Sequence, residues 1–402
     1  MPARLPLHRR RTVLGIAAAT TLSLAGAAIV DFRADADLAS MRATTRDLQH
    51  EWDARPFTRQ PLWGDAHAER AFDHYDDALA RATDLIQQDK ALRDLWKYRL
   101  EPSTAASDAL RAQWQPLVAT MRRGAHATDI RAVPTGVPQT HVTNLLTARG
   151  LTNVTVESAC RALDAGNARE AVELTLDAMT FGHDLLRRGS LIDQMVGGAM
   201  LAIASAEAWP DAQLARLDAD SLRLLGEGLT HLDHMLDPAI DGIGELVTTV
   251  HAMGDTLHSD HYAPSWDAWA FGFSNRWMLA DAFVRTTDFV RTLERERRRP
   301  WPQRQALIQV ELAELVRRGD NRMLAMMVPN YDSAERSRRD VVALVRLLRM
   351  AVAVHQGASL TPLPDPLGDG AIAVRSDDTG TVLRCTGSDE RKHLARHVAQ
   401  RR

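Results

Sequence analysis

Cysteine and lysine are scarce in this sequence, and the short motifs that identify common enzymes are missing. Only two cysteines occur in 402 residues, too few for a disulfide framework or a zinc ribbon. No Gly-x-Ser-x-Gly, Walker loop, glycine-rich dinucleotide-binding run, His-Glu-x-x-His or Cys-x-x-Cys is present. The enzyme classes that these motifs identify are therefore excluded, and we predict neither a cofactor nor a catalytic residue.

A strong net charge is also absent. The formal charge is −3 at pH 7, so no global field attracts nucleic acid, and no nucleic-acid partner is expected. Hydrophobic residues make up 45% of the chain and charged residues 25%, which is typical of a folded globular protein. At roughly 100–200 residues per domain, the length allows two or three domains or one extended helical array.

The first thirty residues carry the most specific pattern in the chain. Arginines at positions 4, 9, 10 and 11 precede an uncharged apolar run over residues 13–30. A basic segment before an apolar core is typical of a signal peptide or a signal anchor. As a helix the run would span about 27 Å, close to the thickness of a bilayer core. We predict that residues 1–30 send the rest of the chain across the cytoplasmic membrane.

Two fates of this segment stay open. If residues 13–30 are retained, they anchor the protein in the inner membrane with a periplasmic body. The segment Ala25-Gly26-Ala27 matches a signal peptidase site, so cleavage near Ala27 would instead release a periplasmic protein. The segment Arg10-Arg11-Thr12-Val13-Leu14 also looks like a twin-arginine export signal. Either fate places the body in the cell envelope.

Residues 31–357 are predicted to form a helical body. Apolar residues recur at helical spacing, for example at Leu110, Trp114 and Leu117. The glycine and alanine pattern of residues 162–171 is typical of a tight turn between two antiparallel helices. We predict an all-α fold in which antiparallel helical hairpins pack as a bundle or a short solenoid.

Two helices of this body have a more specific prediction. Glycine and alanine recur within residues 191–209, and small residues allow helices to approach closely, so we place this helix at the centre. The segment Asp332-Ser333-Ala334-Glu335 has the pattern of a capping box and predicts a helix from there to His355.

Residues 358–402 form a tail of different character. Two short β-prone runs, at residues 371–375 and 381–385, are separated by a polar loop that contains Gly380. They predict a small C-terminal β-hairpin over about residues 371–385.

This tail resembles the C-terminal β-region of type II secretion pseudopilins. The segment Asp365-Pro366-Leu367-Gly368 precedes the hairpin, and Cys385-Thr386-Gly387-Ser388-Asp389 follows it. In pseudopilins an Asp-Pro-x-Gly turn leads through a strand pair to a glycine-containing acidic turn. The calcium-binding Gly-x-Asp-Gly run of that turn is degraded here, so calcium binding is not carried over. The pilin N-terminal motif is missing as well.

The order of segments is similar to that of uncharacterised bacterial envelope proteins. These proteins combine an N-terminal apolar helix, a helical body and a tail of this kind. Loose helical patterns at residues 145–149, 163–166 and 188–192 extend the similarity into the body. The resemblance implies an architecture and no activity.

One polar cluster has the spacing of a metal site. His251, Asp255 and His258 would share one face of a helix, where two imidazoles and a carboxylate could bind one metal ion. His231, Asp233 and His234 could complete the site from a neighbouring helix. The chain has 15 histidines, so chance clusters are expected, and hydrated histidines near a helix end explain the same pattern.

Two further clusters have two interpretations each. Trp266, Trp269 and Trp277 form either a surface for a partner or lipid, or an aromatic core anchor. The arginine-rich run Arg291–Arg304 is either a solvated helix end or a contact for anionic lipid or another polyanion.

The two cysteines also leave two possibilities. Cys160 shares an apolar helix face with Val156 and Leu163, which is typical of a buried thiol. Export would alternatively allow a disulfide between Cys160 and Cys385.

The sequence therefore favours an exported envelope protein without enzymatic activity, a helical scaffold that binds a protein partner. One alternative is a metal-dependent hydrolase that uses His251, Asp255 and His258. Another is a periplasmic lipid-contacting protein that uses the tryptophans between Trp266 and Trp277.

Overall fold

The computed structural model describes residues 39–88, 105–132, 138–258, 266–317, 331–388 and 394–399. Most of these residues are α-helical, and a small antiparallel sheet lies near the C-terminus. The prediction of an all-α body with a C-terminal β-hairpin is confirmed. The predicted export segment, residues 1–30, lies outside the described residues. Within the described ranges, no helix is both long enough and apolar enough to span a bilayer.

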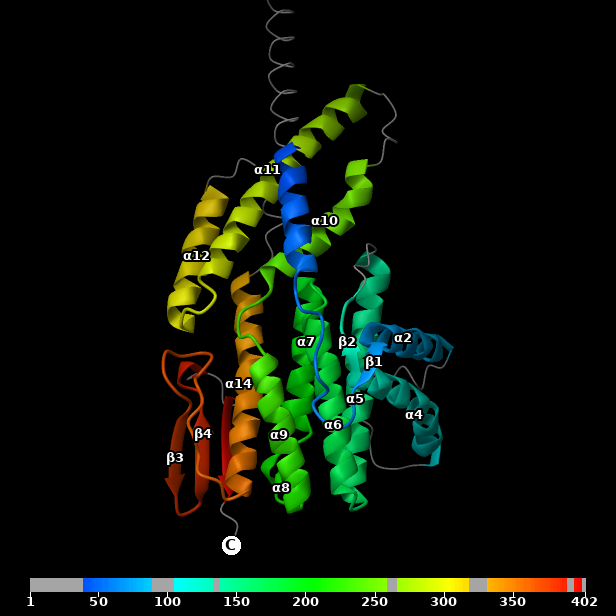
Figure 1. The fold of residues 1–402 in the computed structure, drawn as a ribbon, viewed down its shortest axis with the longest axis vertical. Coiled ribbons are helices and arrows are strands. Elements are labelled where there is room, and N and C mark those ends of the chain that lie inside the picture. The colour runs from blue at the N-terminus through cyan, green and yellow to red at the C-terminus, as the bar shows by residue number, and fades with distance from the viewer. Residues whose placement is uncertain are drawn as a thin grey trace, which may run out of the picture.

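Long helices stand side by side and form the central bundle (Figure 1). They are α5 (Pro138–Asp164), α6 (Ala168–Leu186), α7 (Leu191–Ala202), α9 (Ala219–Met235) and α14 (Tyr331–His355). A π-helical segment, η1 (Ile203–Glu207), continues α7, and the short helix α8 (Asp211–Leu214) precedes α9. α6 contacts α5, α7 and α9 and is buried along almost its whole length, so it lies at the centre of the bundle.

The turn between α5 and α6 matches the predicted hairpin. Gly166 has a φ of +86°, a left-handed conformation that glycine adopts without strain. The amide of Asn167 donates to the carbonyl oxygen of Ala162 at 2.7 Å, and the amide of Gly166 donates to that of Leu163 at 3.0 Å. These bonds satisfy carbonyls at the end of α5. The prediction of an antiparallel pair over residues 162–171 is confirmed.

Small residues bring α6 and α7 close together. A Cβ atom added at Gly197 would lie 2.5 Å from the carbonyl oxygen of Gly182, so only glycine fits at this crossing. α7 also contacts α5 and α14. The helix predicted over residues 191–209 therefore lies inside the bundle, as its small residues indicated.

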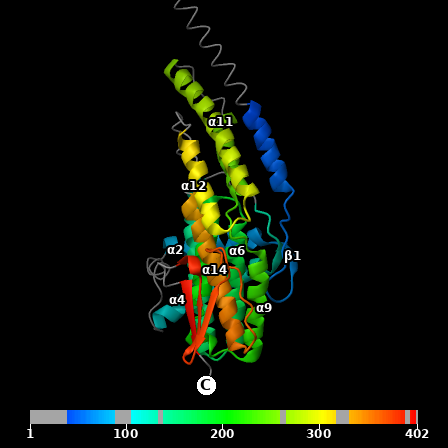
Figure 2. The same ribbon diagram turned by 90° about the vertical axis from the view of Figure 1, so that its left-hand side faces the viewer.

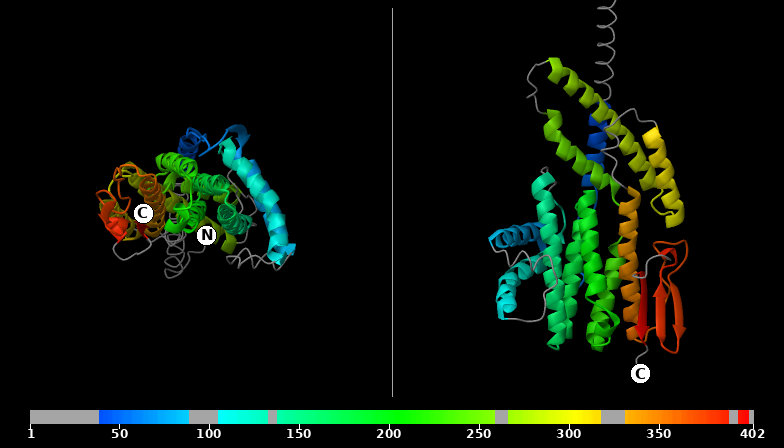
Figure 3. Two further views of the ribbon diagram at one scale, coloured as in Figure 1. Left: turned by 90° about the horizontal axis from the view of Figure 1, so that it is seen from below. Right: turned by 180° about the vertical axis from the view of Figure 1, so that it is seen from behind.

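Two groups of helices surround the bundle. Residues 39–53 and the helices α10 (Gly242–His258), α11 (Trp266–Arg295) and α12 (Trp301–Arg317) extend beyond one end of it (Figure 1). The helices α2 (Ala71–Gln88) and α4 (Ala105–His126) cover the outer side of α5 (Figure 3). The parallel strands β1 (His67–Arg70) and β2 (Ala127–Asp129) flank this second pair.

The tail is an antiparallel sheet with the strand order β3-β4-β5. Its strands are β3 (Ala373–Asp377), β4 (Gly380–Arg384) and β5 (Ala395–Ala399). β4 and β5 contact α14, and Figure 2 shows the sheet against that helix. The hairpin predicted over residues 371–385 is confirmed, whereas β5 was not predicted.

Cys160 and Cys385 do not form a disulfide with each other. Cys160 is half-buried on α5, against the hydrophobic core, which agrees with its predicted apolar face. Cys385 is buried directly after β4. The alternative prediction, a disulfide between them, is not met, because α7 and α14 lie between α5 and the sheet (Figure 1).

Candidate functional site

A cleft of about 810 Å³ lies where the central bundle, the upper helices and the tail meet. Six segments form its walls. They are residues 55–57, the end of α6 at residues 186–187, residues 235–241 between α9 and α10, residues 297–301 between α11 and α12, three residues of α14, and residues 364–370 of the tail. We refer to this site as the arginine cleft.

The lining of the arginine cleft is strongly basic. Eight arginines line it, namely Arg55, Arg187, Arg297, Arg298, Arg299, Arg338, Arg339 and Arg346. The acidic lining residues are Asp237, Asp241, Asp365 and Asp369. None of the described lining residues is serine, threonine, cysteine, histidine, lysine or tyrosine. The cleft therefore offers many guanidinium donors and few groups that act as nucleophiles or proton carriers.

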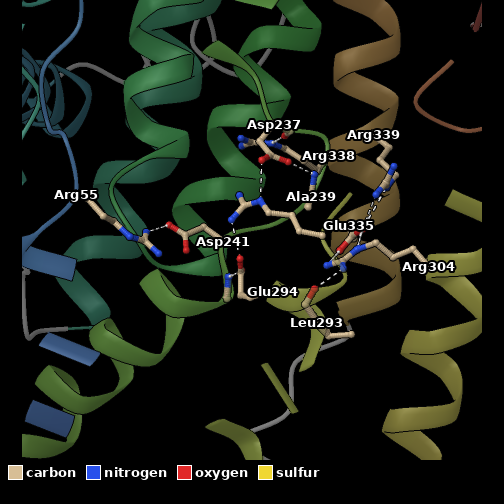
Figure 4. Close-up of polar contacts among 12 residues, drawn as sticks. Arg55, Asp237, Ala239, Asp241, Leu293, Glu294, Arg304, Glu335, Arg338 and Arg339 are labelled. Carbon is tan, nitrogen blue, oxygen red and sulfur yellow. Dashed lines mark hydrogen bonds and ion pairs between the residues drawn. The ribbon is translucent and has the colours of Figure 1, made fainter. Parts of the chain in front are cut away.

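Some of these arginines are neutralised by carboxylates (Figure 4). Arg55 and Asp241 form an ion pair at 2.5 Å. Arg297 binds Asp237 and Glu294, each at 2.7 Å. Burial raises the pKa of Asp241, but the attraction of Arg55 outweighs burial and holds that pKa below its usual range.

Arg339 is held by a buried carboxylate on its own helix. Its Nη2 donates to Glu335 at 2.9 Å, and Arg304 donates to the same carboxylate. Arg339 also lies over the ring of Trp301, 5.0 Å from its centroid. The helix predicted to begin near Asp332 is present as α14, but Glu335 is engaged by two arginines, which the predicted capping box did not anticipate.

Arg346 and Arg349, one helical turn apart on α14, bind the same carboxylate. Arg346 and Arg349 each bind Asp233 of α9 at 2.8 Å. Arg346 also donates to the carbonyl oxygen of Pro364 at 2.8 Å, which ties the tail to α14.

Three arginines of the cleft have no carboxylate partner in the described part of the chain: Arg187, Arg298 and Arg338. Arg298 is exposed. Arg187 ends α6 and donates to the carbonyl oxygen of Pro56 at 3.0 Å. Burial lowers the pKa of Arg187, although Asp241 and Asp184 act in the opposite direction. The cleft thus holds more positive charge than its own carboxylates neutralise.

Arg338 is the most unusual of the three. Its Nε donates to the carbonyl oxygen of Asp237 at 2.9 Å (Figure 4). Its Nη1 atom is buried and has no hydrogen-bond partner among the described residues. Burial lowers the pKa of this guanidinium to about 10. A buried cationic donor without a partner carries a desolvation penalty that an anion in the cleft would remove.

Two tail segments, residues 365–368 and residues 385–388, come together beside the cleft. The carboxylate of Asp365 accepts hydrogen bonds from the amide of Thr386 at 2.5 Å and from its hydroxyl at 2.9 Å. A Cβ atom at Gly387 would lie 2.0 Å from the carbonyl oxygen of Leu367, so this close turn requires glycine. The contact holds the Asp-Pro-x-Gly turn and the glycine turn against each other.

The predicted metal ligands are not tested by the structure. His251, Asp255 and His258 fall in α10, but their side chains lie outside what is described. His231 and His234 instead line a second cleft with α14 and residues 359–363, and α9 and α10 lie at different levels of the molecule (Figure 1). Among the described residues, no group of three or more histidines, cysteines or carboxylates could hold a metal ion.

The structure describes the predicted arginine run but not the side chains of the predicted tryptophan cluster. Trp266, Trp269 and Trp277 fall in α11, and their side chains also lie outside the described part. Within the run Arg291–Arg304, the arginines lie in different environments. Arg304 is buried and paired with Glu335, whereas residues 297–299 line the arginine cleft.

No protein family, curated protein or solved structure matches this chain. The similarity of the tail to pseudopilins stays a prediction. The function of the arginine cleft is therefore argued from its own geometry and charge.

Proposed function

We propose that this protein is an exported binding protein of the cell envelope without enzymatic activity. In this proposal the arginine cleft receives an oxyanion group, a phosphate or a carboxylate, of its ligand. The envelope location rests on the apolar run over residues 13–30 and its preceding arginines. The group can belong to a small molecule or to an acidic side chain of the predicted protein partner.

One observation carries the proposal: Arg338 has a buried nitrogen with no hydrogen-bond partner among the described residues, in a cleft with surplus positive charge. Guanidinium groups present donors in a planar fork that matches carboxylate and phosphate oxygens. Arg187 and Arg298, which have no carboxylate partner in the described ranges either, line the same cleft. An oxyanion there would satisfy donors for which the described residues supply no acceptor.

The lining residues favour binding over catalysis. Asp237 and Asp241 are held in ion pairs by Arg297 and Arg55, so they are poorly placed to act as general bases. The hydrolase alternative relies on His251, Asp255 and His258, whose side chains lie outside the described part of the structure.

Titration calorimetry on the full chain tests the proposal. Pyrophosphate and a tetraglutamate peptide serve as probes of the two sources of oxyanion. We expect Arg338→Gln and Arg187→Gln to weaken binding about tenfold or more, because a hydrogen bond to a charged group contributes about 1.5–3 kcal/mol. Higher salt should weaken binding as well.

The matched control is Arg81→Gln, since Arg81 lies on α2 in an exposed pair with Asp77 and does not line the cleft. The control should bind both probes as the unmodified chain does. If neither probe binds, or if Arg338→Gln binds as tightly as Arg81→Gln, the proposal is wrong.

A further inference from the structure

A second hollow lies next to the arginine cleft, between α7 and α14. Its volume is about 350 Å³, within the usual size of small-molecule sites. Its walls are mainly apolar and include Met195, Ala199, Ala202, Ile240, Val341 and Leu344. We refer to this hollow as the α7–α14 groove.

Arg338 lines both the arginine cleft and the groove. The connection between α9 and α10 separates the two: Asp237 and Asp241 line the cleft, whereas Ile240 lines the groove. Arg338 contacts this connection, because its Nε donates to the carbonyl oxygen of Asp237. A cationic group therefore stands at the boundary between a basic cleft and an apolar groove.

The charge of the groove is uneven. Asp340 also lines it, but residues two apart on a helix point to nearly opposite sides. Arg338 and Asp340 therefore flank the groove face of α14, which carries Val341 and Leu344. An anionic group is favoured at the Arg338 flank and repelled from the Asp340 flank, so a bound molecule would have a defined orientation.

Apolar side chains are exposed at the rim of the groove. Met195 lines the groove and is 53% exposed, and Ile192, one helical turn earlier on α7, is 50% exposed. Exposed apolar surface that borders an apolar hollow is typical of a binding site for an apolar group.

We propose that the α7–α14 groove and Arg338 together bind one amphiphile, an unbranched alkyl or acyl chain with a phosphate or carboxylate head. The chain lies in the groove, and the head contacts Arg338 at the boundary with the arginine cleft. This inference rests on the proposed oxyanion site for the head and adds the chain as a new claim.

A series of alkyl phosphates tests the chain without changing the head. Inorganic phosphate, butyl phosphate, hexyl phosphate and octyl phosphate, kept monomeric, are titrated into the full chain. We expect affinity to rise about two- to fourfold for each buried methylene. Arg338→Gln should weaken the whole series by a similar factor.

Two variants locate the chain. Ala199→Leu fills the groove, and Met195→Glu places a carboxylate at its rim. Both should abolish the gain with chain length, and Ala199→Leu, which adds no charge, should leave the affinity for inorganic phosphate unchanged. Leu146→Glu is the matched control for the charge change, because Leu146 is 64% exposed on α5 and lies outside the groove. It should retain the gain.

The outcomes separate this inference from the proposed function. If inorganic phosphate binds but chain length has no effect, the amphiphile is excluded and the oxyanion site stands. If the gain persists in Ala199→Leu, the chain lies elsewhere and the groove assignment is wrong. If an amphipathic peptide binds in place of the alkyl chains, and Ala199→Leu blocks it, the groove is a protein-docking site instead. If neither inorganic phosphate nor any alkyl phosphate binds, the proposed oxyanion site is wrong, and the amphiphile site that depends on it is wrong as well.

Discussion

Arg59 is buried, and Arg338 is half-buried with a buried Nη1 atom, but their hydrogen bonding differs. Nε and Nη2 of Arg59 donate to the two carboxylate oxygens of Asp184 at 2.7 and 2.6 Å. Its Nη1 and Nη2 also donate to the carbonyl oxygens of Ala125 and Gly124. Arg338 has one hydrogen bond, to the carbonyl oxygen of Asp237, and a buried Nη1 without a described partner.

The pKa values follow this difference. Burial lowers the pKa of both groups, but the attraction of Asp184 outweighs burial at Arg59 and raises its pKa above the usual value. At Arg338 burial dominates, and the pKa is lowered to about 10. All three nitrogen atoms of Arg59 donate hydrogen bonds, and these bonds hold the segment after residue 53 to α6 and α4. Arg338 keeps a buried Nη1 without a described partner, and this atom can donate to a ligand.

The largest expected effect is the loss of the Arg59 ion pair. Asp184→Ala leaves a buried cation without its carboxylate, so we expect the free energy of unfolding to fall by about 3–5 kcal/mol. Urea unfolding followed by circular dichroism measures it. The matched control Asp77→Ala removes only an exposed pair with Arg81 and should lose less than about 1 kcal/mol. Equal losses in both variants would remove the distinction between the two sites.

Ligand should stabilise the unmodified chain more than a chain that lacks Arg338. At a pyrophosphate concentration about 100 times the dissociation constant, binding should add about 2.7 kcal/mol to the free energy of unfolding. At the same pyrophosphate concentration, Arg338→Met should gain about 1.4 kcal/mol or less, because its dissociation constant is raised about tenfold or more. A full shift in the variant would show that the anion binds elsewhere.

Arg338→Met should cost little stability by itself. The variant loses one hydrogen bond to Asp237 but also removes a poorly satisfied buried cation, so we expect a change within about 1 kcal/mol in either direction. The same urea unfolding experiment compares it with Asp184→Ala. A loss as large as that of Asp184→Ala would mean that Arg338 is a structural group like Arg59.

The smallest expected effect is a pH dependence of the free energy of unfolding, caused by His183 beside the Arg59–Asp184 ion pair. Burial lowers the pKa of His183 and outweighs its hydrogen bond to Asp184. The unfolded chain then takes up a proton near pH 6.5 that the folded chain resists. The stability from His183 is therefore complete above about pH 6.5 and is lost as the pH falls below it. In thermal unfolding between about pH 7.5 and 5.5, His183→Gln should show a weaker decline than the unmodified chain, and identical declines would contradict this assignment.

The sequence was informative where local chemistry decides the structure. Gly166 and the helical spacing around it predicted the hairpin between α5 and α6, and the polar loop containing Gly380 predicted the strand pair. Local patterns do not say which charged side chains become buried. The capping interpretation of Glu335 missed the arginines that engage it, because Arg304 comes from a different helix.

The arginine cleft was only partly predictable. The run Arg291–Arg304 was recognised as a possible contact for polyanions, and residues 297–299 do line the cleft. The sequence does not identify Arg187 and Arg338 as lining residues of a shared cleft, because the walls come from six segments that are far apart in the sequence. The adjacent pair Arg338-Arg339, within the apolar pattern of α14, was the one local signal available.

Diffraction from crystals soaked with tungstate tests the central claim most directly, because the metal of this oxyanion gives an anomalous signal that locates it. We predict an anomalous peak in the arginine cleft, with tungstate oxygens within hydrogen-bond distance of Arg338 Nη1, and no peak there in Arg338→Met. A fully soaked crystal of the unmodified chain with no peak beside Arg338 would contradict the account.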